Sequence, residues 1–158
     1  MKCPLPRLIL CISLHIAAGV AALLPITVMA DSKEDAVDLT CRMSVPAKAT
    51  TGKAVSFKFE MTNRGKKAVN VLTWNTPLEG FFGKFLQVTG PEGEAKYKGA
   101  MVKRGAPSQE DYVSIRGGAT VTKTLNLATA YELNVAGKYE VVFTGKLFDA
   151  TTGKIPRG

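Results

Sequence analysis

The stretch "VSFKFEMTNRG", Val55 to Gly65, decides the fold class because apolar and polar side chains alternate along it. One face carries Val55, Phe57, Phe59 and Met61, and the other carries Ser56, Lys58, Glu60 and Thr62. A period of two with one apolar face is typical of an antiparallel strand that covers a core and faces water on its other side. The turn sequence "NRGKK" then ends the strand.

Similar short stretches, rich in β-branched or aromatic residues and bounded by Gly, Pro or Asn, occur on both sides of this one. They are "VDLTCRMSV" (37–45), "AVNVLTW" (68–74), "KFLQVTG" (84–90), "EAKYKG" (94–99), "DYVSI" (111–115), "ATVTKTLNL" (119–127) and "GKYEVVFTGKLF" (137–148). This spacing predicts an all-β domain over residues 31–150: an immunoglobulin-like antiparallel β-sandwich of about 7–8 strands. Residues 151–158 are expected to form a flexible tail. The predicted core is Val55, Phe57, Phe59, Val71, Leu125, Tyr139, Val141 and Phe143.

The immunoglobulin-like interpretation has a more specific cue in "LNLATAYELNVAGKYEV" (125–141). A strand ends, one helical turn is expected around Leu127 to Tyr131, and Tyr139 opens the last strand. In immunoglobulin-like sandwiches a tyrosine at this corner bonds through its hydroxyl to a nearby backbone group. Tyr139 and Tyr131 are both candidates; the alternative is two ordinary half-buried tyrosines.

Residues 1–30 have the features of a signal peptide. Lys2 and Arg7 precede an uncharged run from Leu8 to Met29, and the small residue Ala30 precedes Asp31. We therefore expect cleavage after Ala30 and a secreted or periplasmic protein. The alternative is a retained membrane anchor, since the apolar run is long enough to span a bilayer.

Cleavage would leave one cysteine. Of the three, Cys3 and Cys11 lie in the signal segment, so Cys41 could form no internal disulfide. Its place on the apolar side of stretch 37–45 predicts a buried, inert thiol, with an intermolecular bridge as the alternative.

The chemistry that the chain could carry is limited by its histidine content. The only histidine, His15, lies in the signal segment. This argues against Ser-His-Asp or Cys-His catalysis and against histidine-ligated zinc. There is no GxxxxGK[ST] or GxGxxG phosphate loop. The acidic pairs Glu92/Glu94 and Glu110/Asp111 lie in Gly/Pro-rich loops, so we expect their carboxylates to be exposed to solvent. The sequence predicts a protein that is not an enzyme and holds no cofactor or metal.

The charge pattern does not favour nucleic acid as a partner. The formal net charge is +8, but the basic residues are dispersed among acids, with Lys66-Lys67 and Lys103-Arg104 as the densest spots. No aromatic residues interleave on a basic face, as nucleic-acid modules require. We expect no nucleic acid, no membrane contact after cleavage, and a monomer.

The stretch "LTWNTPLEGFFGKF" (72–85) is unusual because it combines the only tryptophan, a proline turn and three phenylalanines. Trp74, at a strand end, is predicted to be core. The side chains of Leu78, Phe81, Phe82 and Phe85 cannot easily all point inward from one loop. Either some apolar surface is exposed as a partner site, or the loop folds back over an open end of the sandwich.

Three blocks in order, "VLTWNTPLEGFFGKFLQV", "YKGAMVKRGAPSQEDYVSI" and "LNLATAYELNVAGKYEVVF", resemble the N-terminal β-domain of bacterial deuterolysin and peptidyl-Lys zinc metalloendopeptidases (aspzincins). The resemblance covers about Val55 to Phe143, and "NTPLEG" and "KRGAP…DY" are its most specific parts. In that family a zinc peptidase domain with a HExxH helix follows. No HExxH occurs here, so no catalytic residue carries over.

The resemblance implies a non-catalytic module that accompanies a secreted zinc metalloprotease and inhibits or chaperones it. The alternatives are a structural or adhesive sandwich with an unrelated partner, or the remnant of a truncated protease gene. Because the shared blocks are two turn-rich loops, 75–82 and 103–112, the predicted contact residues lie there. They are Asn75, Pro77, Glu79, Phe81, Phe82, Lys103, Arg104 and Tyr112.

Overall fold

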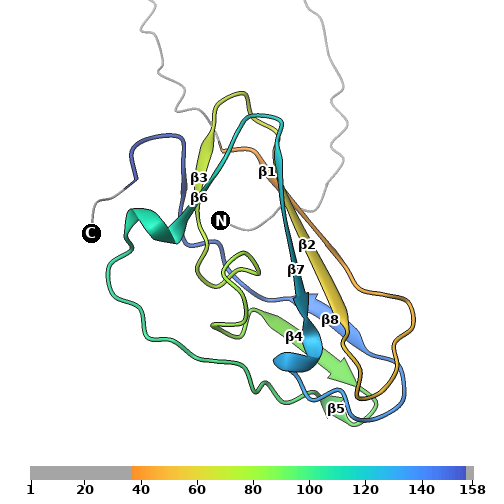
Figure 1. The fold of residues 1–158 in the computed structure, drawn as a ribbon. Coiled ribbons are helices and arrows are strands. Elements are labelled where there is room, and N and C mark those ends of the chain that lie inside the picture. The colour runs from red at the N-terminus through yellow and green to blue at the C-terminus, as the bar shows by residue number, and fades with distance from the viewer. Residues whose placement is uncertain (1–36, 156–158) are drawn as a thin grey trace, which may run out of the picture.

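The structure is a computed structural model that describes residues 37–155. Within this part the chain forms nine strands and two short 3-10 helices, and no α-helix (Figure 1). The strands are β1 (Leu39–Ser44), β2 (Ser56–Asn63), β3 (Val69–Leu72), β4 (Leu86–Gly90), β5 (Gly93–Glu94), β6 (Tyr112–Ile115), β7 (Thr120–Asn126), β8 (Glu140–Phe143) and β9 (Ala150–Thr151). The 3-10 helices are η1 (Gln109–Asp111) and η2 (Leu127–Thr129).

The strands pair in three small antiparallel sheets, with the orders β1-β2-β7, β6-β3-β9 and β5-β4-β8. The prediction of an all-β antiparallel fold is therefore confirmed, although the pairing forms three short sheets in place of two continuous ones. The first sheet is in register along the whole of β2, where Met61 faces Cys41 on one side and Val121 on the other. β8 passes behind β2 and β7 in Figure 1, and the two layers touch where Phe59 stacks on Phe143 with ring centroids 6.2 Å apart.

One hydrophobic cluster joins all three sheets. Phe57 and Phe59 of β2 are fully buried, as the alternation predicts, and so is Val71 of β3. The other predicted core residues pack against the cluster but keep partial exposure: Val55, Leu125, Tyr139, Val141 and Phe143. The largest buried side chains outside the predicted core list are those of Tyr131, Phe85, Met61, Leu86 and Leu127.

The two candidate corner tyrosines both bond to backbone. Tyr139 directly precedes β8, and its hydroxyl donates at 2.8 Å to the carbonyl of Val135, four residues upstream. The fully buried Tyr131 hydroxyl donates at 2.7 Å to the carbonyl of Leu86. The expected helical turn is η2.

Two sequence predictions are corrected by burial. Trp74 was expected in the core, but it is only half-buried, because its indole N–H bonds to a loop carboxylate at the surface. Cys41 was expected to be buried, but it is half-buried in β1, which within residues 37–155 is an edge strand that pairs only with β2.

The boundaries also differ in detail. β9 pairs with β3 through Thr151 and Asn70, so the ordered pairing extends one residue into the expected tail. The predicted signal segment, residues 1–30, lies outside the described residues. Among residues 37–155, no helix is long and apolar enough to cross a membrane.

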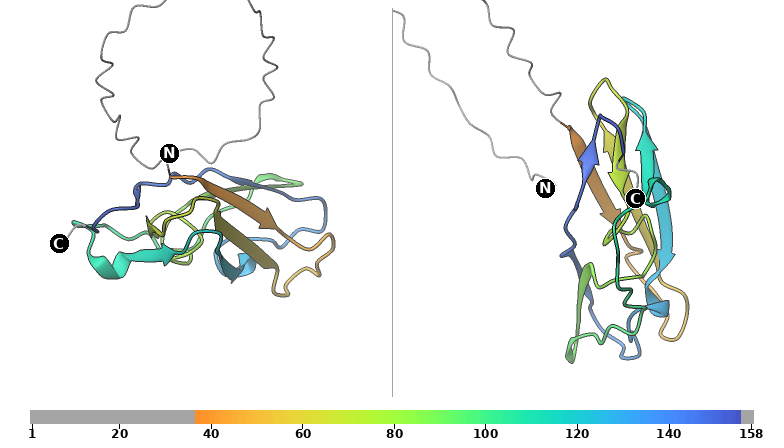
Figure 2. Two further views of the ribbon diagram at one scale, coloured as in Figure 1. Left: turned by 90° about the horizontal axis from the view of Figure 1, so that it is seen from above. Right: turned by 90° about the vertical axis from the view of Figure 1, so that its left-hand side faces the viewer.

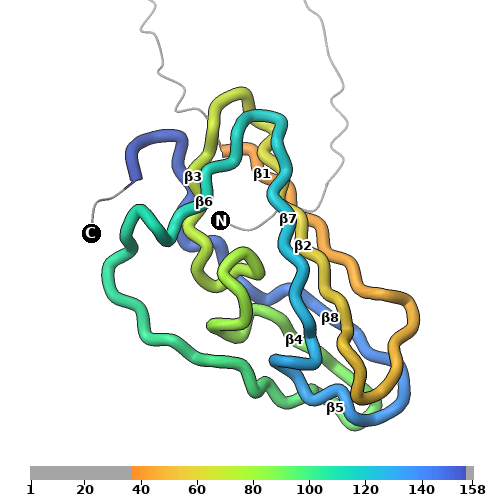
Figure 3. Tube along the Cα trace, viewed as in Figure 1, coloured from red at the N-terminus to blue at the C-terminus, as the bar shows by residue number. Residues whose placement is uncertain are grey.

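The connection between β5 and η1 is the longest path without a strand, and it runs along the outside of the molecule in Figures 2 and 3. Along it, Tyr97 makes an isolated bridge with Tyr131. The Tyr97 hydroxyl lies within hydrogen-bond distance of two carbonyl oxygens, those of Phe81 at 3.1 Å and Ala100 at 3.0 Å, and its single proton is donated to either one or shared between them. This connection is thereby held against the loop that follows β3.

Candidate protein-binding groove

The two loops predicted to contact a partner lie against each other. Arg104, from the β5–η1 connection, forms an ion pair with Glu79 of the β3–β4 loop. Its guanidinium also lies over the ring of Trp74, 5.1 Å from the centroid. A cation at this distance is attracted by the indole π-system. Backbone contact adds to this, since the Val102 N–H donates to the Phe82 carbonyl at 3.4 Å.

Glu79 is the residue that organises the β3–β4 loop. Its carboxylate accepts the Asn75 backbone N–H at 2.6 Å while it pairs with Arg104. Asn75 has a φ of 57°, the left-handed region that asparagine tolerates better than most residues. Burial raises the pKa of Glu79, and the Asn75 N–H and the Arg104 charge oppose that rise only in part.

Trp74 is fixed from its other side by η1. Its Nε1–H donates to Oδ1 of Asp111 at 2.9 Å. The other carboxylate oxygen of Asp111 accepts the backbone N–H and the hydroxyl of Ser108, at 2.8 and 2.9 Å. The Ser108 N–H lowers the pKa of Asp111 most, and the Trp74 N–H adds to this. Asp111 is therefore held ionised, and the indole orientation is set by two loops distant in sequence.

Trp74, Glu79 and Arg104 line a groove of about 710 Å³. Four exposed apolar side chains line it: Phe82, Met101, Val102 and Phe148. Met101 is 74% exposed and Phe148 61%, high values for such large apolar groups. Clustered exposed apolar side chains mark interaction sites more often than single ones do.

The groove lining also includes a hydrogen-bonded polar pair. The Tyr112 hydroxyl, on β6, donates to Oδ2 of Asp149 at 2.6 Å, and both residues line the groove. This bond is the main cause of a Tyr112 pKa raised to about 12, so the phenol stays neutral at ordinary pH. The groove, which we call the Trp74 groove, thus combines tyrosine, tryptophan and arginine with apolar side chains. That composition is typical of the energetic centres of protein interfaces.

The structure brings five of the eight predicted contact residues to this groove: Asn75, Glu79, Phe82, Arg104 and Tyr112. The other three do not line it. Pro77 is buried, and Lys103 is exposed beside the groove. Phe81 packs inward, stacked on Phe85 with centroids 5.5 Å apart, and so it belongs to the half-buried layer around the core.

Sequence reasoning missed Trp74, Met101, Val102, Phe148 and Asp149 as lining residues. Met101 and Val102 carried a signal, because they are two large apolar residues in a turn-rich stretch without strand alternation. Phe148 and Asp149 carried none, since only the fold places the segment before β9 beside β6.

The groove holds no arrangement that indicates a metal. Within residues 37–155, no group of three or more His, Cys, Asp or Glu side chains is placed to hold an ion. The two carboxylates that line it already have partners: Glu79 pairs with Arg104 and accepts the Asn75 N–H, and Asp149 accepts the Tyr112 hydroxyl. What this arrangement can do is present a shaped apolar surface with oriented polar groups.

Comparison with known proteins gives a partial match. No protein-family profile matches the chain. An extracellular protease of Aeromonas hydrophila is 32% identical to it over 79 residues, 50% of this chain and 22% of that protein. The chain therefore resembles a region that is about a fifth of the length of that relative.

Proposed function

We propose that this protein is a secreted, non-catalytic protein-binding module whose partner is a secreted zinc metalloprotease of the deuterolysin type. The partner would dock on the Trp74 groove, and the module would inhibit the protease or assist its folding. The observation that carries the proposal is the set of exposed apolar side chains around the fixed Trp74–Arg104 pair.

The geometry supports a binding role because the groove is preorganised. Arg104 and Trp74 are each held by a second partner, Glu79 and Asp111 respectively. A partner would therefore meet side chains whose rotamer entropy has already been lost, and preorganisation of this kind raises affinity. The partial similarity to an extracellular protease supports both the protease context and secretion.

We also infer that the three sheets together form an immunoglobulin-like sandwich. The Phe59–Phe143 stack supports face-to-face packing of the β1-β2-β7 and β5-β4-β8 sheets. The Tyr139 bond to Val135 supports the immunoglobulin-like corner. In such sandwiches loops cluster at the ends, which suits a groove built from loops.

The test is the affinity of the purified protein for a secreted deuterolysin-type protease of the same organism, together with protease activity with and without the protein. Replacing Phe82 or Arg104 by alanine should weaken binding by about 2 kcal/mol or more, since aromatic and arginine side chains supply much of the binding energy at the centre of an interface. The melting temperature should change little, because Phe82 is exposed and Arg104 packs on the surface.

Arg116→Ala is the matched control, because Arg116 is an exposed arginine at the opposite end of β6 from η1. It should leave affinity unchanged. Loss of stability with intact binding would mean that the groove only supports the fold. No binding by the unmodified protein would favour an adhesive sandwich with an unrelated partner or a gene remnant.

A further inference from the structure

A second binding surface lies at β8, away from the Trp74 groove. β8 is the last strand of the sheet β5-β4-β8, and among residues 37–155 no strand pairs with its outer edge, the side away from β4. An edge strand with unpaired backbone groups is a template for another strand.

The hydrogen-bond pattern shows which residues face that edge. Thr144 donates to the Phe85 carbonyl at 2.9 Å, and Val142 lies opposite Gln87 in the same register. Because backbone groups alternate in direction along an antiparallel strand, Glu140 and Val142 bond toward β4. Val141 and Phe143 therefore direct their N–H and C=O groups to the outer edge.

The hydrogen bonds between β4 and its other neighbour, β5, confirm this alternation. Val88 accepts the Ala95 N–H at 2.8 Å, so the even-numbered residues of β4 bond toward β5 and the odd-numbered ones toward β8. The two strands agree: among residues 37–155, the β8 residues whose backbone groups have no strand partner are Val141 and Phe143.

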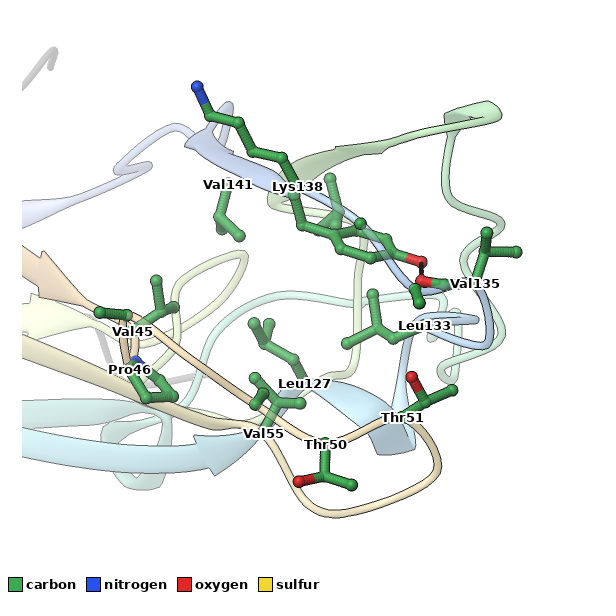
Figure 4. A pocket seen from close by; sticks show the side chains of 16 residues that line it. Val45, Pro46, Thr50, Thr51, Val55, Leu127, Leu133, Val135, Lys138 and Val141 are labelled. Atoms are coloured by element: carbon green, nitrogen blue, oxygen red, sulfur yellow. Dashed lines mark hydrogen bonds between the residues drawn. The ribbon is translucent and has the colours of Figure 1, made fainter.

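An apolar pocket of about 460 Å³ adjoins this edge. In Figure 4, Val141 borders it on one side and Val45 and Pro46 on another, with Val55 and Leu127 between the two layers. β1 ends at Ser44, so residues of loop 45–55, and not a paired strand, line this side of the pocket. The inward-facing side chain of an added strand would enter this pocket, because directly opposed residues point to the same face of a sheet.

Charge around the edge indicates the kind of occupant. Four lysines lie in loop 45–55 or flank β8, against one acid, Glu140; they are Lys48, Lys53, Lys138 and Lys146. Lys138 directs its amine away from the pocket (Figure 4). Two copies of this chain that paired through this edge would bring these lysines together, and like charges would repel. An acidic partner segment would be attracted instead.

We propose that the outer edge of β8 binds an extended segment of a partner protein by strand addition. The segment has apolar side chains at alternate positions, one of which enters the pocket, and acidic residues at its ends. Main-chain bonds supply affinity in such complexes, and pockets for alternate side chains supply specificity.

The probe is a blocked peptide, Glu-Glu-Val-Thr-Val-Thr-Val-Glu-Glu, whose valines would face the pocket and whose valine amides would therefore face β8. N-methylation of the valine amides should weaken binding at least about tenfold, because several main-chain bonds are lost. N-methylation of the threonine amides, which face away, should leave affinity within about threefold. Equal effects of the two methylated peptides, or no binding of the parent peptide, would overturn the proposal.

Hydrogen exchange gives a second readout on the full chain. The amides of Val141 and Phe143 should become protected on peptide addition, while those of Glu140 and Val142 are protected beforehand. Val45→Glu, at the pocket mouth, should weaken binding, whereas Val142→Thr, on the other face of β8, should not. Protection of Val141 and Phe143 that depends on protein concentration without peptide would identify a second copy as the occupant and overturn the partner assignment.

Discussion

Glu79 couples the two loops of the Trp74 groove, and its titration should be visible in the fluorescence of Trp74. Burial raises the pKa of Glu79 above its ordinary value of 4.5, while bonds from Ser108 and Trp74 lower that of Asp111 below 3.8. On acidification Glu79 is therefore protonated first. Its pair with Arg104 is then lost while Asp111 still holds the indole.

We expect Trp74 emission to change with a midpoint above pH 4.5, because Arg104 lies over the ring only while Glu79 holds it. Glu79→Gln should remove this transition, and Glu60→Gln on β2 should keep it. A transition that persists in Glu79→Gln would assign the change to another group. The tryptophan is the only one in the chain, so the signal is specific.

The Tyr131 side chain supplies a hydrogen bond to β4 at a position that the short neighbouring strand β5 does not reach. β5 has two residues. The residue after it, Ala95, donates its N–H to the Val88 carbonyl, but β5 does not extend as far as Leu86. The Tyr131 hydroxyl donates to the Leu86 carbonyl instead. Tyr131→Phe should lower the free energy of unfolding by about 1–3 kcal/mol, because a buried carbonyl loses its partner.

The same residue gives a pH dependence whose sign is fixed. Burial is the main cause of a Tyr131 pKa raised to about 12, from an ordinary value of 10. The advantage of tyrosine over phenylalanine should be full below pH 10 and be lost as the pH rises through about 12. Urea unfolding of both proteins between pH 8 and 12 measures it. A constant difference across this range would contradict the assignment.

Elements with a strong local pattern were predictable from sequence, and elements defined by distant contacts were not. The alternation around Phe57 and Phe59 predicted β2 and its buried face, because side chains with a period of two can turn the apolar set toward the core in one way only. Trp74 was misplaced because its N–H partner, Asp111, comes from a different loop. β9 and the groove position of Phe148 depend on long-range pairing with β3, and no local pattern in residues 147–151 indicates that partner.

At the scale of the whole molecule, a series of aromatic contacts links the groove to the core. Phe81, in the β3–β4 loop, stacks on Phe85, and Phe85 lies 6.3 Å from Phe143. Phe143 in turn stacks on Phe59 of β2. Since one cluster also includes Val71 of the third sheet, no sheet has a core of its own. The described part should therefore unfold as one cooperative unit.

Urea unfolding followed by far-ultraviolet circular dichroism, which reports the strands, and by Trp74 fluorescence, which reports the groove, should give coincident transitions. Phe57→Ala removes a fully buried ring from β2 and should cost roughly 3–5 kcal/mol. Because the groove loop rests on the same cluster, both midpoints should fall together and by the same amount. Ser56→Ala, an exposed neighbour on the same strand, should change stability by less than about 0.5 kcal/mol. If the fluorescence transition stayed in place while the strands unfolded earlier, the groove loops would be stable without the sheets, and the shared core would not be what holds them.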